Sequence, residues 1–144
     1  MTEIWPVLGG QTSDRLPERR EKALYSLDTL DAMANGFDTA IRMMRSRDPQ
    51  RAEDGFGWLR DHAAEHLPAL IEQFENEQAD RGLRSWLLEL IGIAESPEAL
   101  PVLTAQLNGT DELLRDWAVI GLTRLNTREA RTALWRARAN GAIA

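Results

Sequence analysis

The sequence predicts an all-α protein of stacked antiparallel helix pairs, an α-solenoid, and three observations support this. Apolar residues recur at helical spacing along the chain, while no stretch alternates apolar and polar residues over more than four positions. Capping residues, prolines and glycines stand where helices are expected to begin and end. Segments of the chain also resemble one another at a step of 31–33 residues, a period typical of repeated helix pairs.

The composition is that of one soluble globular domain. The chain has 144 residues, of which 43% are hydrophobic and 28% charged, and its net charge is −6. It has no cysteine, which excludes disulfides, thiol catalysis and cysteine-ligated metals. We expect a cytoplasmic protein without membrane association, because no apolar run is long enough to span a bilayer and no signal peptide is recognisable.

We expect eight helices of about 10–17 residues, grouped in pairs. Residues 1–14 are predicted to be an N-terminal arm and residues 15–144 a single repeat domain. The four expected pairs are 17–48, 49–79, 80–110 and 111–142. Their apolar stripes, in chain order, are Leu24, Leu27, Leu30 and Ala34; Phe37, Ala40, Ile41 and Met44; Leu67, Leu70, Ile71 and Phe74; Leu100, Leu103 and Leu107; and Ala130, Ala133, Leu134 and Ala137.

Residues that favour the beginnings and ends of helices flank these stripes. Asp48-Pro49 and Ser96-Pro97-Glu98 combine an N-cap with a proline in the first turn. Either Asn126 or Thr127 is suited to cap the final helix. Three glycines that follow apolar stripes are expected to end helices in the left-handed conformation: Gly36, Gly109 and Gly141.

The repeat is visible when the segment 84–106 is moved along the chain. A forward shift of 31 places Arg84-Ser85-Trp86 on Arg115-Asp116-Trp117. A backward shift of 33 matches five identical residues, namely Arg84, Leu100, Pro101, Leu103 and Gln106 with Arg51, Leu67, Pro68, Leu70 and Gln73. One such pair cannot bury its apolar face alone, so neighbouring pairs are expected to stack.

Residues 111–122, with Leu125, resemble the first helix of a HEAT-like repeat: an acidic start, an aliphatic-Arg pair, and small and aliphatic residues leading to a Leu-Gly-Leu-like end. Residues 83–93 resemble it equally well, and residues 97–107 resemble the second helix. The match covers 80–141 well and 49–79 loosely, and the spacing of tetratricopeptide repeats is missing. The resemblance implies a curved array of hairpins whose second helices line the concave face.

One motif imitates a metalloenzyme. His62-Ala63-Ala64-Glu65-His66 has the order of inverted zinc peptidases, whose chemistry needs both imidazoles on one helix and a third ligand. The repeat places this segment across a turn between two helices, which favours a turn with two exposed histidines. The sequence contains no nucleophile elbow and no phosphate-binding glycine loop, and we expect neither a metal nor a cofactor.

Five tryptophans stand among only nine aromatic residues. Trp86 and Trp117 hold equivalent positions on successive first helices, which predicts packing between repeats, and Trp58 is also expected in the core. Trp135 lies near three arginines, Arg131, Arg136 and Arg138. Three interpretations stay open for this group: a polar cap on the last repeat, an anchor for an acidic partner, and a nucleic-acid contact.

Charge is distributed unevenly along the chain. Residues 61–114 carry 11 acids and 2 bases, whereas residues 115–144 carry 6 arginines and 2 acids. This gradient either gives the molecule an electrostatic axis or reflects solvated helix faces alone. If the acidic stretch docks, its partner presents a basic patch, and the same acids disfavour nucleic acid as a partner.

We expect a non-enzymatic scaffold that binds another protein on its concave second-helix face. An immunity-type inhibitor of a cognate toxin fits the small size, the acidity and the cytoplasmic character. HEAT-like repeats also resemble those in bilin lyases, which leaves open an accessory subunit or small enzyme of that type. The expected partner-binding residues are Ile71, Glu72, Glu75, Thr104, Ala105, Asn108, Trp135 and Arg136.

Overall fold

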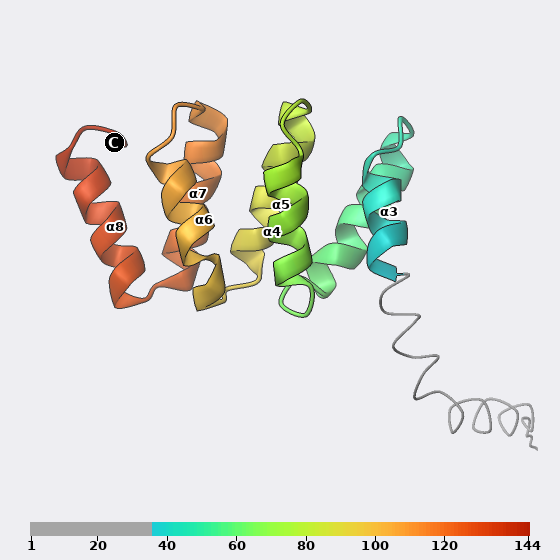
Figure 1. The fold of residues 1–144 in the computed structure, drawn as a ribbon, viewed down its shortest axis with the longest axis horizontal. Coiled ribbons are helices and arrows are strands. Elements are labelled where there is room, and N and C mark those ends of the chain that lie inside the picture. Colours follow the sequence, from blue (N-terminus) through green and yellow to red (C-terminus); the bar gives the residue numbers. More distant parts are fainter. Residues whose placement is uncertain (1–35) are drawn as a thin grey trace, which may run out of the picture. The chain divides into compact units, whose positions relative to one another are not determined.

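The computed structural model describes residues 36–144, and this part of the chain consists of helices joined by short turns, without a strand (Figure 1). Residues 39–144 form one compact unit. After helical residues 39–44 it contains α3 (Pro49–Asp61), α4 (Leu67–Asn76), α5 (Arg81–Ile93), the 3-10 helix η1 (Pro97–Ala99), α6 (Leu100–Leu107), α7 (Glu112–Leu125) and α8 (Arg128–Ala139).

The all-α prediction is confirmed for the described residues. Each of the expected segments 49–79, 80–110 and 111–142 contains two α-helices. The expected arm at 1–14 and most of the expected pair 17–48 lie outside the described residues, as does the stripe that begins at Leu24. No helix within 36–144 is long and apolar enough to cross a membrane.

The first helices of the three segments all begin at an aspartate. Asp48, Asp80 and Asp111 are the N-caps of α3, α5 and α7, and they stand 32 and 31 residues apart. Each carboxylate accepts a hydrogen bond from a backbone N–H in the first turn, which satisfies a donor that has no partner inside the helix. The expected caps Ser96 and Thr127 are confirmed in the same way.

The second helix of the middle segment begins differently from the prediction. Two prolines four residues apart, Pro97 and Pro101, prevent a regular first turn, because Pro101 has no N–H to donate to the Pro97 carbonyl. The Pro97 carbonyl accepts from the Leu100 N–H instead, which produces the 3-10 turn η1. The α-helix that follows, α6, has 8 residues and is therefore shorter than expected.

The glycine prediction for helix ends was partly wrong. Gly141 has a φ of 79° as expected, but Gly36 lies within a helix and Gly109 does not adopt a positive φ. Gly36 is helical together with Phe37 and Ala40, whose burial outweighs the helix penalty of one glycine, about 1 kcal/mol. The left-handed positions are taken instead by Glu95 (φ 50°) and Asn126 (φ 53°), and asparagine tolerates this conformation better than most residues.

Packing follows the order of the chain. Each first helix contacts the next, α3 with α5 and α5 with α7, while α4 packs on α5 and α6 packs on α7. At the end of the row, α8 packs on both α6 and α7. Within this unit, Figure 1 shows α3 at one end and α8 at the other, with α4 and α5 overlapping in the view and α6 and α7 overlapping next to them. The largest fully buried side chains come from α3 to α7: Leu59, Leu67, Leu70, Phe74, Leu87, Leu88, Leu90, Ile91, Leu103, Leu107 and Leu122.

The junction of α5 with α7 is closed by main-chain contact. A Cβ added to Gly92 would lie 2.9 Å from the Gly121 Cα, and one added to Gly121 would lie 3.0 Å from Leu103 Cδ2. A side chain at Gly92 would therefore force the two helices apart, and one at Gly121 would press on Leu103 and on the Gly92 main chain. We use the name α5–α7 junction for this contact of Gly92 with Gly121 together with the ion pair between Arg81 and Asp111.

An arginine and an aspartate join the beginnings of the same two helices. Arg81 donates through Nε and an Nη to the two carboxylate oxygens of Asp111, at 2.9 and 3.0 Å. These hydrogen bonds, together with the first-turn N–H groups that Asp111 caps, lower the pKa of its carboxyl to about 2, although partial burial acts in the opposite direction.

Arginines also hold the ends of second helices. Arg84 donates to the Glu77 carbonyl at 2.9 Å, and Arg115 donates to the Gly109 carbonyl at 3.0 Å. The side chain of Glu77 accepts from the Asp80 N–H and from Arg45, each at 2.8 Å, and these bonds lower the pKa of its carboxyl. The turns between successive helix pairs are thus tied by hydrogen bonds that repeat along the chain.

Candidate binding surfaces

The eight residues expected to bind a partner are all accessible to solvent. They lie on α4 (Ile71, Glu72 and Glu75), on α6 and its C-cap (Thr104, Ala105 and Asn108) and on α8 (Trp135 and Arg136). Ile71 and Thr104 are half-buried and the other six are exposed. Because α6 packs on α8, the residues on these two helices belong to neighbouring parts of the surface. We call the eight residues the second-helix stripe.

Trp135 is the most conspicuous member of this stripe. Its side chain is 68% exposed, while Ile120 on α7, at 40%, is the other large exposed hydrophobic residue in the described part of the chain. A tryptophan that keeps most of its apolar surface in water leaves a large area for a partner to bury. The prediction that Trp135 differs from the other tryptophans therefore agrees with its surroundings.

Two of the arginines near Trp135 donate hydrogen bonds to nearby residues of the chain. Arg131 donates to the backbone carbonyl of Asn126 at 2.7 Å and to its side-chain oxygen at 3.1 Å. Arg138 donates to the carbonyl oxygen of Ala144 at 3.1 Å. Arg136 makes no hydrogen bond or ion pair with the described residues. Arg131 and Arg138 are thus engaged locally, while Trp135 and Arg136 stay available to a partner, and the three interpretations of this group stay predictions.

The histidine motif does fall across a turn, because residues 62–66 connect α3 with α4. The expectation of two exposed histidines was wrong, however, since both are half-buried against Trp58. The His62 ring stacks on the indole at 4.1 Å between centroids, its Nδ1 lies 2.7 Å from the Trp58 carbonyl oxygen, and the His66 ring lies 5.6 Å away. Trp58 is accordingly half-buried, not a core residue. Within residues 36–144, no group of three or more metal-ligating side chains is placed to hold a metal ion.

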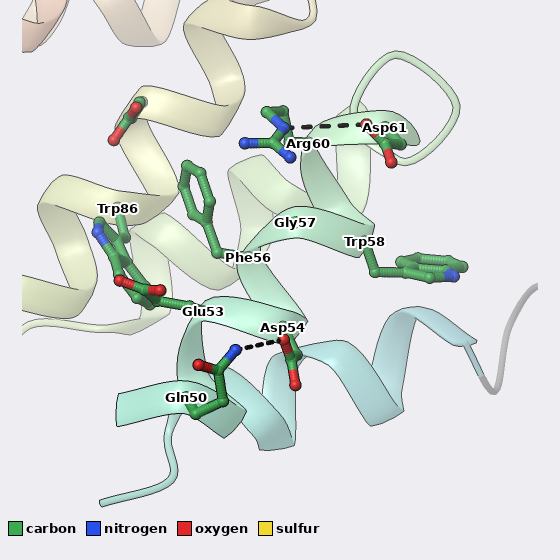
Figure 2. Close-up of a pocket in the computed structure, with 10 residues that line it drawn as sticks. Gln50, Glu53, Asp54, Phe56, Gly57, Trp58, Arg60, Asp61 and Trp86 are labelled. Carbon is green, nitrogen blue, oxygen red and sulfur yellow. Dashed lines mark hydrogen bonds and ion pairs between the residues drawn. The ribbon is translucent and has the colours of Figure 1, made fainter. Parts of the chain in front are cut away.

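A groove of about 640 Å³ runs along α3 and α5, on helices outside the second-helix stripe (Figure 2). We call it the α3–α5 groove. Aromatic and acidic side chains dominate its lining, with one arginine near its edge. The lining residues are Gln50, Glu53, Asp54, Phe56, Gly57, Trp58, Arg60, Asp61, Trp86 and Glu89.

An aromatic pair forms one wall of this groove. The rings of Phe56 and Trp86 lie 5.0 Å apart between centroids and are tilted by 42°. Figure 2 shows Phe56 directed toward Trp86 and Trp58 directed away from both. Both rings of the pair are half-buried. The expected packing of Trp86 between successive first helices is therefore confirmed, but part of its surface faces the groove.

The acids of the groove fall into two groups. Asp54 accepts a hydrogen bond from Gln50 at 3.0 Å, and Asp61 lies 3.8 Å from Arg60. Glu53 and Glu89, in contrast, have no hydrogen-bond or ion-pair partner among the described residues. Burial raises the pKa of the Glu89 carboxyl, and the more distant charges of Arg124 and Arg60 only partly oppose this effect.

Sequence reasoning missed Phe56, Glu53 and Glu89 as members of a site. At the 33-residue step, Glu53 aligns with Trp86 and Phe56 aligns with Glu89. The acid therefore comes first on α3, whereas the aromatic residue comes first on α5. A search for identical residues overlooks this reversed order, although the reversed order allows Phe56 to contact Trp86.

No family model, curated protein or solved structure matches this chain.

Proposed function

We propose that this chain is a HEAT-like array of helix pairs that acts as a non-enzymatic protein-binding module. The repeated N-cap aspartates at steps of 32 and 31 residues support the array. The equivalent roles of Arg84 and Arg115, which each hold the end of a preceding second helix, also support it. Pro68 and Pro101 stand at equivalent first-turn positions of α4 and α6. Stacked pairs of this kind build extended surfaces suited to protein recognition.

The observation that carries the function is the exposure of Trp135. Tryptophan and arginine are enriched among residues that dominate binding energy at protein interfaces, and Arg136 lies beside Trp135 in the sequence. With 68% of its side chain exposed, Trp135 has most of its apolar surface to bury on association. We therefore assign Trp135 as the anchor of the second-helix stripe.

The acids of the stripe indicate the charge of the partner. Glu72 and Glu75 are exposed on α4, and the surrounding stretch 61–114 is strongly acidic. These carboxylates would repel phosphate groups, which disfavours nucleic acid, and would attract a protein with a basic patch. The proposed partner is thus a protein that offers an apolar pocket for Trp135 and basic residues toward α4.

Affinity capture with three full-length baits tests this proposal: the natural chain, Trp135→Ala and Ile120→Ala. Ile120→Ala is the matched control because it removes an exposed hydrophobic side chain from α7, outside the stripe. We expect a protein that the natural chain and Ile120→Ala retain and that Trp135→Ala retains poorly. Identical sets of retained proteins for all three baits, with equal circular dichroism spectra, would overturn the assignment of Trp135 as the anchor.

A further inference from the structure

The α3–α5 groove has a regular arrangement of aromatic and acidic residues. On α3, Glu53 precedes Phe56 by three residues, and on α5, Trp86 precedes Glu89 by three residues. Residues three apart lie on the same face of a helix, so each aromatic ring has a carboxylate one turn away. Because Phe56 contacts Trp86 across the two helices, the two carboxylates flank one shared aromatic surface.

Of the four acids that line the groove, these two have no partner among the described residues. Glu53 and Glu89 make no hydrogen bond or ion pair with described residues, whereas the neighbouring Asp54 and Asp61 each have a local partner. Glu89 is half-buried, so its charge is only partly solvated. A cation brought to this position would make a direct hydrogen-bonded ion pair with Glu89, in place of the weaker interactions that Glu89 has with the charges of Arg124 and Arg60.

The lining charges select the sign of the ligand. Four acids and one arginine line the groove, and the arginine, Arg60, already lies 3.8 Å from Asp61. A cation is attracted both to these carboxylates and to the faces of aromatic rings. Among protein side chains, arginine suits the arrangement best, because its planar guanidinium stacks on an aromatic ring while its N–H groups bind a carboxylate in a bidentate manner.

We propose that the α3–α5 groove receives an arginine side chain from a basic segment of a partner protein. The guanidinium would lie over the Phe56–Trp86 pair and donate to Glu89, while Glu53 would attract further basic residues of the segment. A groove of about 640 Å³ has room for a side chain together with flanking backbone. This site lies on different helices from the second-helix stripe and does not depend on Trp135.

The proposal is tested with a capped peptide of alternating glycine and arginine, added to the full chain while the indole N–H resonance of Trp86 is followed by NMR. Matched peptides carry lysine or the neutral isostere citrulline in place of arginine. We expect the arginine peptide to shift the Trp86 resonance in a saturable manner, the lysine peptide to bind several-fold more weakly, and the citrulline peptide to have no effect. Equal binding of the arginine and lysine peptides, or binding of the citrulline peptide, would overturn the proposal.

Two double variants separate a site from general attraction by an acidic protein. Glu53→Gln with Glu89→Gln removes two charges inside the groove, and Glu72→Gln with Glu75→Gln removes two charges on α4. We expect the first pair to weaken binding of the arginine peptide at least tenfold and the second pair to weaken it less than twofold. Equal losses would reduce the effect to net charge and contradict the site. Thermal unfolding monitored by circular dichroism verifies that both variants are folded.

Two further measurements identify the source of the arginine. Free arginine amide is expected to bind much more weakly than the peptide, and equal affinities would overturn a protein segment as the ligand. Sedimentation of the chain without peptide is expected to be independent of concentration. Self-association that Glu53→Gln with Glu89→Gln abolishes would instead assign the groove to a second copy of this chain, against the proposal.

Discussion

Helix α5 meets its two neighbouring first helices in opposite ways. Toward α7, the α5–α7 junction brings the main chains together at Gly92 and Gly121 and pairs Arg81 with Asp111. Toward α3, two aromatic rings meet, and the space beside them is the α3–α5 groove. The comparison teaches that a repeated helix pair does not impose repeated contacts, because the size of a few side chains decides whether a junction is closed or open.

The closed and the open junction also differ in the pKa of their carboxylates. Asp111 in the closed junction is held by Arg81 and by N–H groups, which lower its pKa to about 2. Glu89 at the open junction has a raised pKa because burial is not compensated by a nearby partner. A paired carboxylate stabilises the folded state when it is charged, whereas an unpaired half-buried one does not.

The largest expected effect comes from breaking the closed junction. In Gly121→Ala the new Cβ would meet Leu103 Cδ2 at 3.0 Å and Gly92 Cα at 3.1 Å, so we expect a loss of about 1–3 kcal/mol in the free energy of unfolding. Denaturant unfolding measures it. Gly57→Ala is the matched control at the groove, where the nearest atom is an Arg60 guanidinium nitrogen at 3.7 Å. This control should stabilise the protein by up to about 1 kcal/mol through helix propensity. Equal effects of the two substitutions would contradict the comparison.

A smaller loss is expected when the ion pair of the closed junction is removed. Asp111→Asn keeps a good N-cap residue but removes the charge that Arg81 binds. Because the pKa of Asp111 is lowered to about 2, its stabilising contribution is present above its usual range near pH 4 and is lost as the pH falls toward 2.

For this partly exposed pair we expect Asp111→Asn to cost about 1 kcal/mol at neutral pH and progressively less below pH 4. Urea unfolding at several pH values measures the difference. Asp48→Asn provides the control, because Asp48 caps α3 and has no ion pair with the described residues. A loss from Asp48→Asn as large as that from Asp111→Asn would show that capping, and not the pair with Arg81, is responsible.

The aromatic contact at the open junction is expected to contribute less to the free energy of unfolding than the ion pair does. Phe56→Leu keeps an apolar side chain of similar size but removes the ring that lies against Trp86, so we expect a loss of about 0.5–1 kcal/mol. Trp86→Phe, which preserves an aromatic pair, should lose less than Phe56→Leu in the same thermal unfolding experiment. The reverse order would mean that buried area and not the ring contact stabilises this junction.

The smallest effect, with the opposite sign, is expected at Glu89. Since its pKa is raised in the folded state, the unfolded chain releases the proton first as the pH increases, and the folded state loses stability over that range. Glu89→Gln should therefore be as stable as the natural protein or up to about 0.5 kcal/mol more stable at pH 7. The gain should vanish below pH 4, where Glu89 is protonated in both states. A clear loss of stability at pH 7 would indicate a stabilising partner for Glu89.

Sequence reasoning was most successful where structure depends on neighbouring residues. The N-caps Asp48, Ser96 and Thr127 and the segments 49–79, 80–110 and 111–142 follow from local hydrogen bonding and helical periodicity. Helix ends were less predictable, because a glycine such as Gly36 can be helical and a non-glycine residue such as Asn126 can adopt the left-handed conformation.

The surfaces were predictable only in part. The exposure of Trp135 followed from its position among polar residues, and the second-helix stripe is solvent-accessible as expected. The groove depends on the distance between α3 and α5 and on the orientation of the Phe56 side chain. The spacing of residues along the sequence determines neither of them. The contact of His66 with Trp58 was missed for a similar reason, since it requires the turn at 62–66 to fold back on α3, whereas His62 lies only four residues after Trp58.

The glycine contact between α5 and α7 also has a mechanical consequence. Side chains between two helices act as a compliant layer, because they absorb small displacements by changing rotamer. At Gly92 and Gly121 that layer is absent, and one backbone rests directly on the other. A closer approach of α5 to α7 at this point therefore cannot be absorbed by a change of rotamer. The α5–α7 junction is a rigid joint in the row of helices.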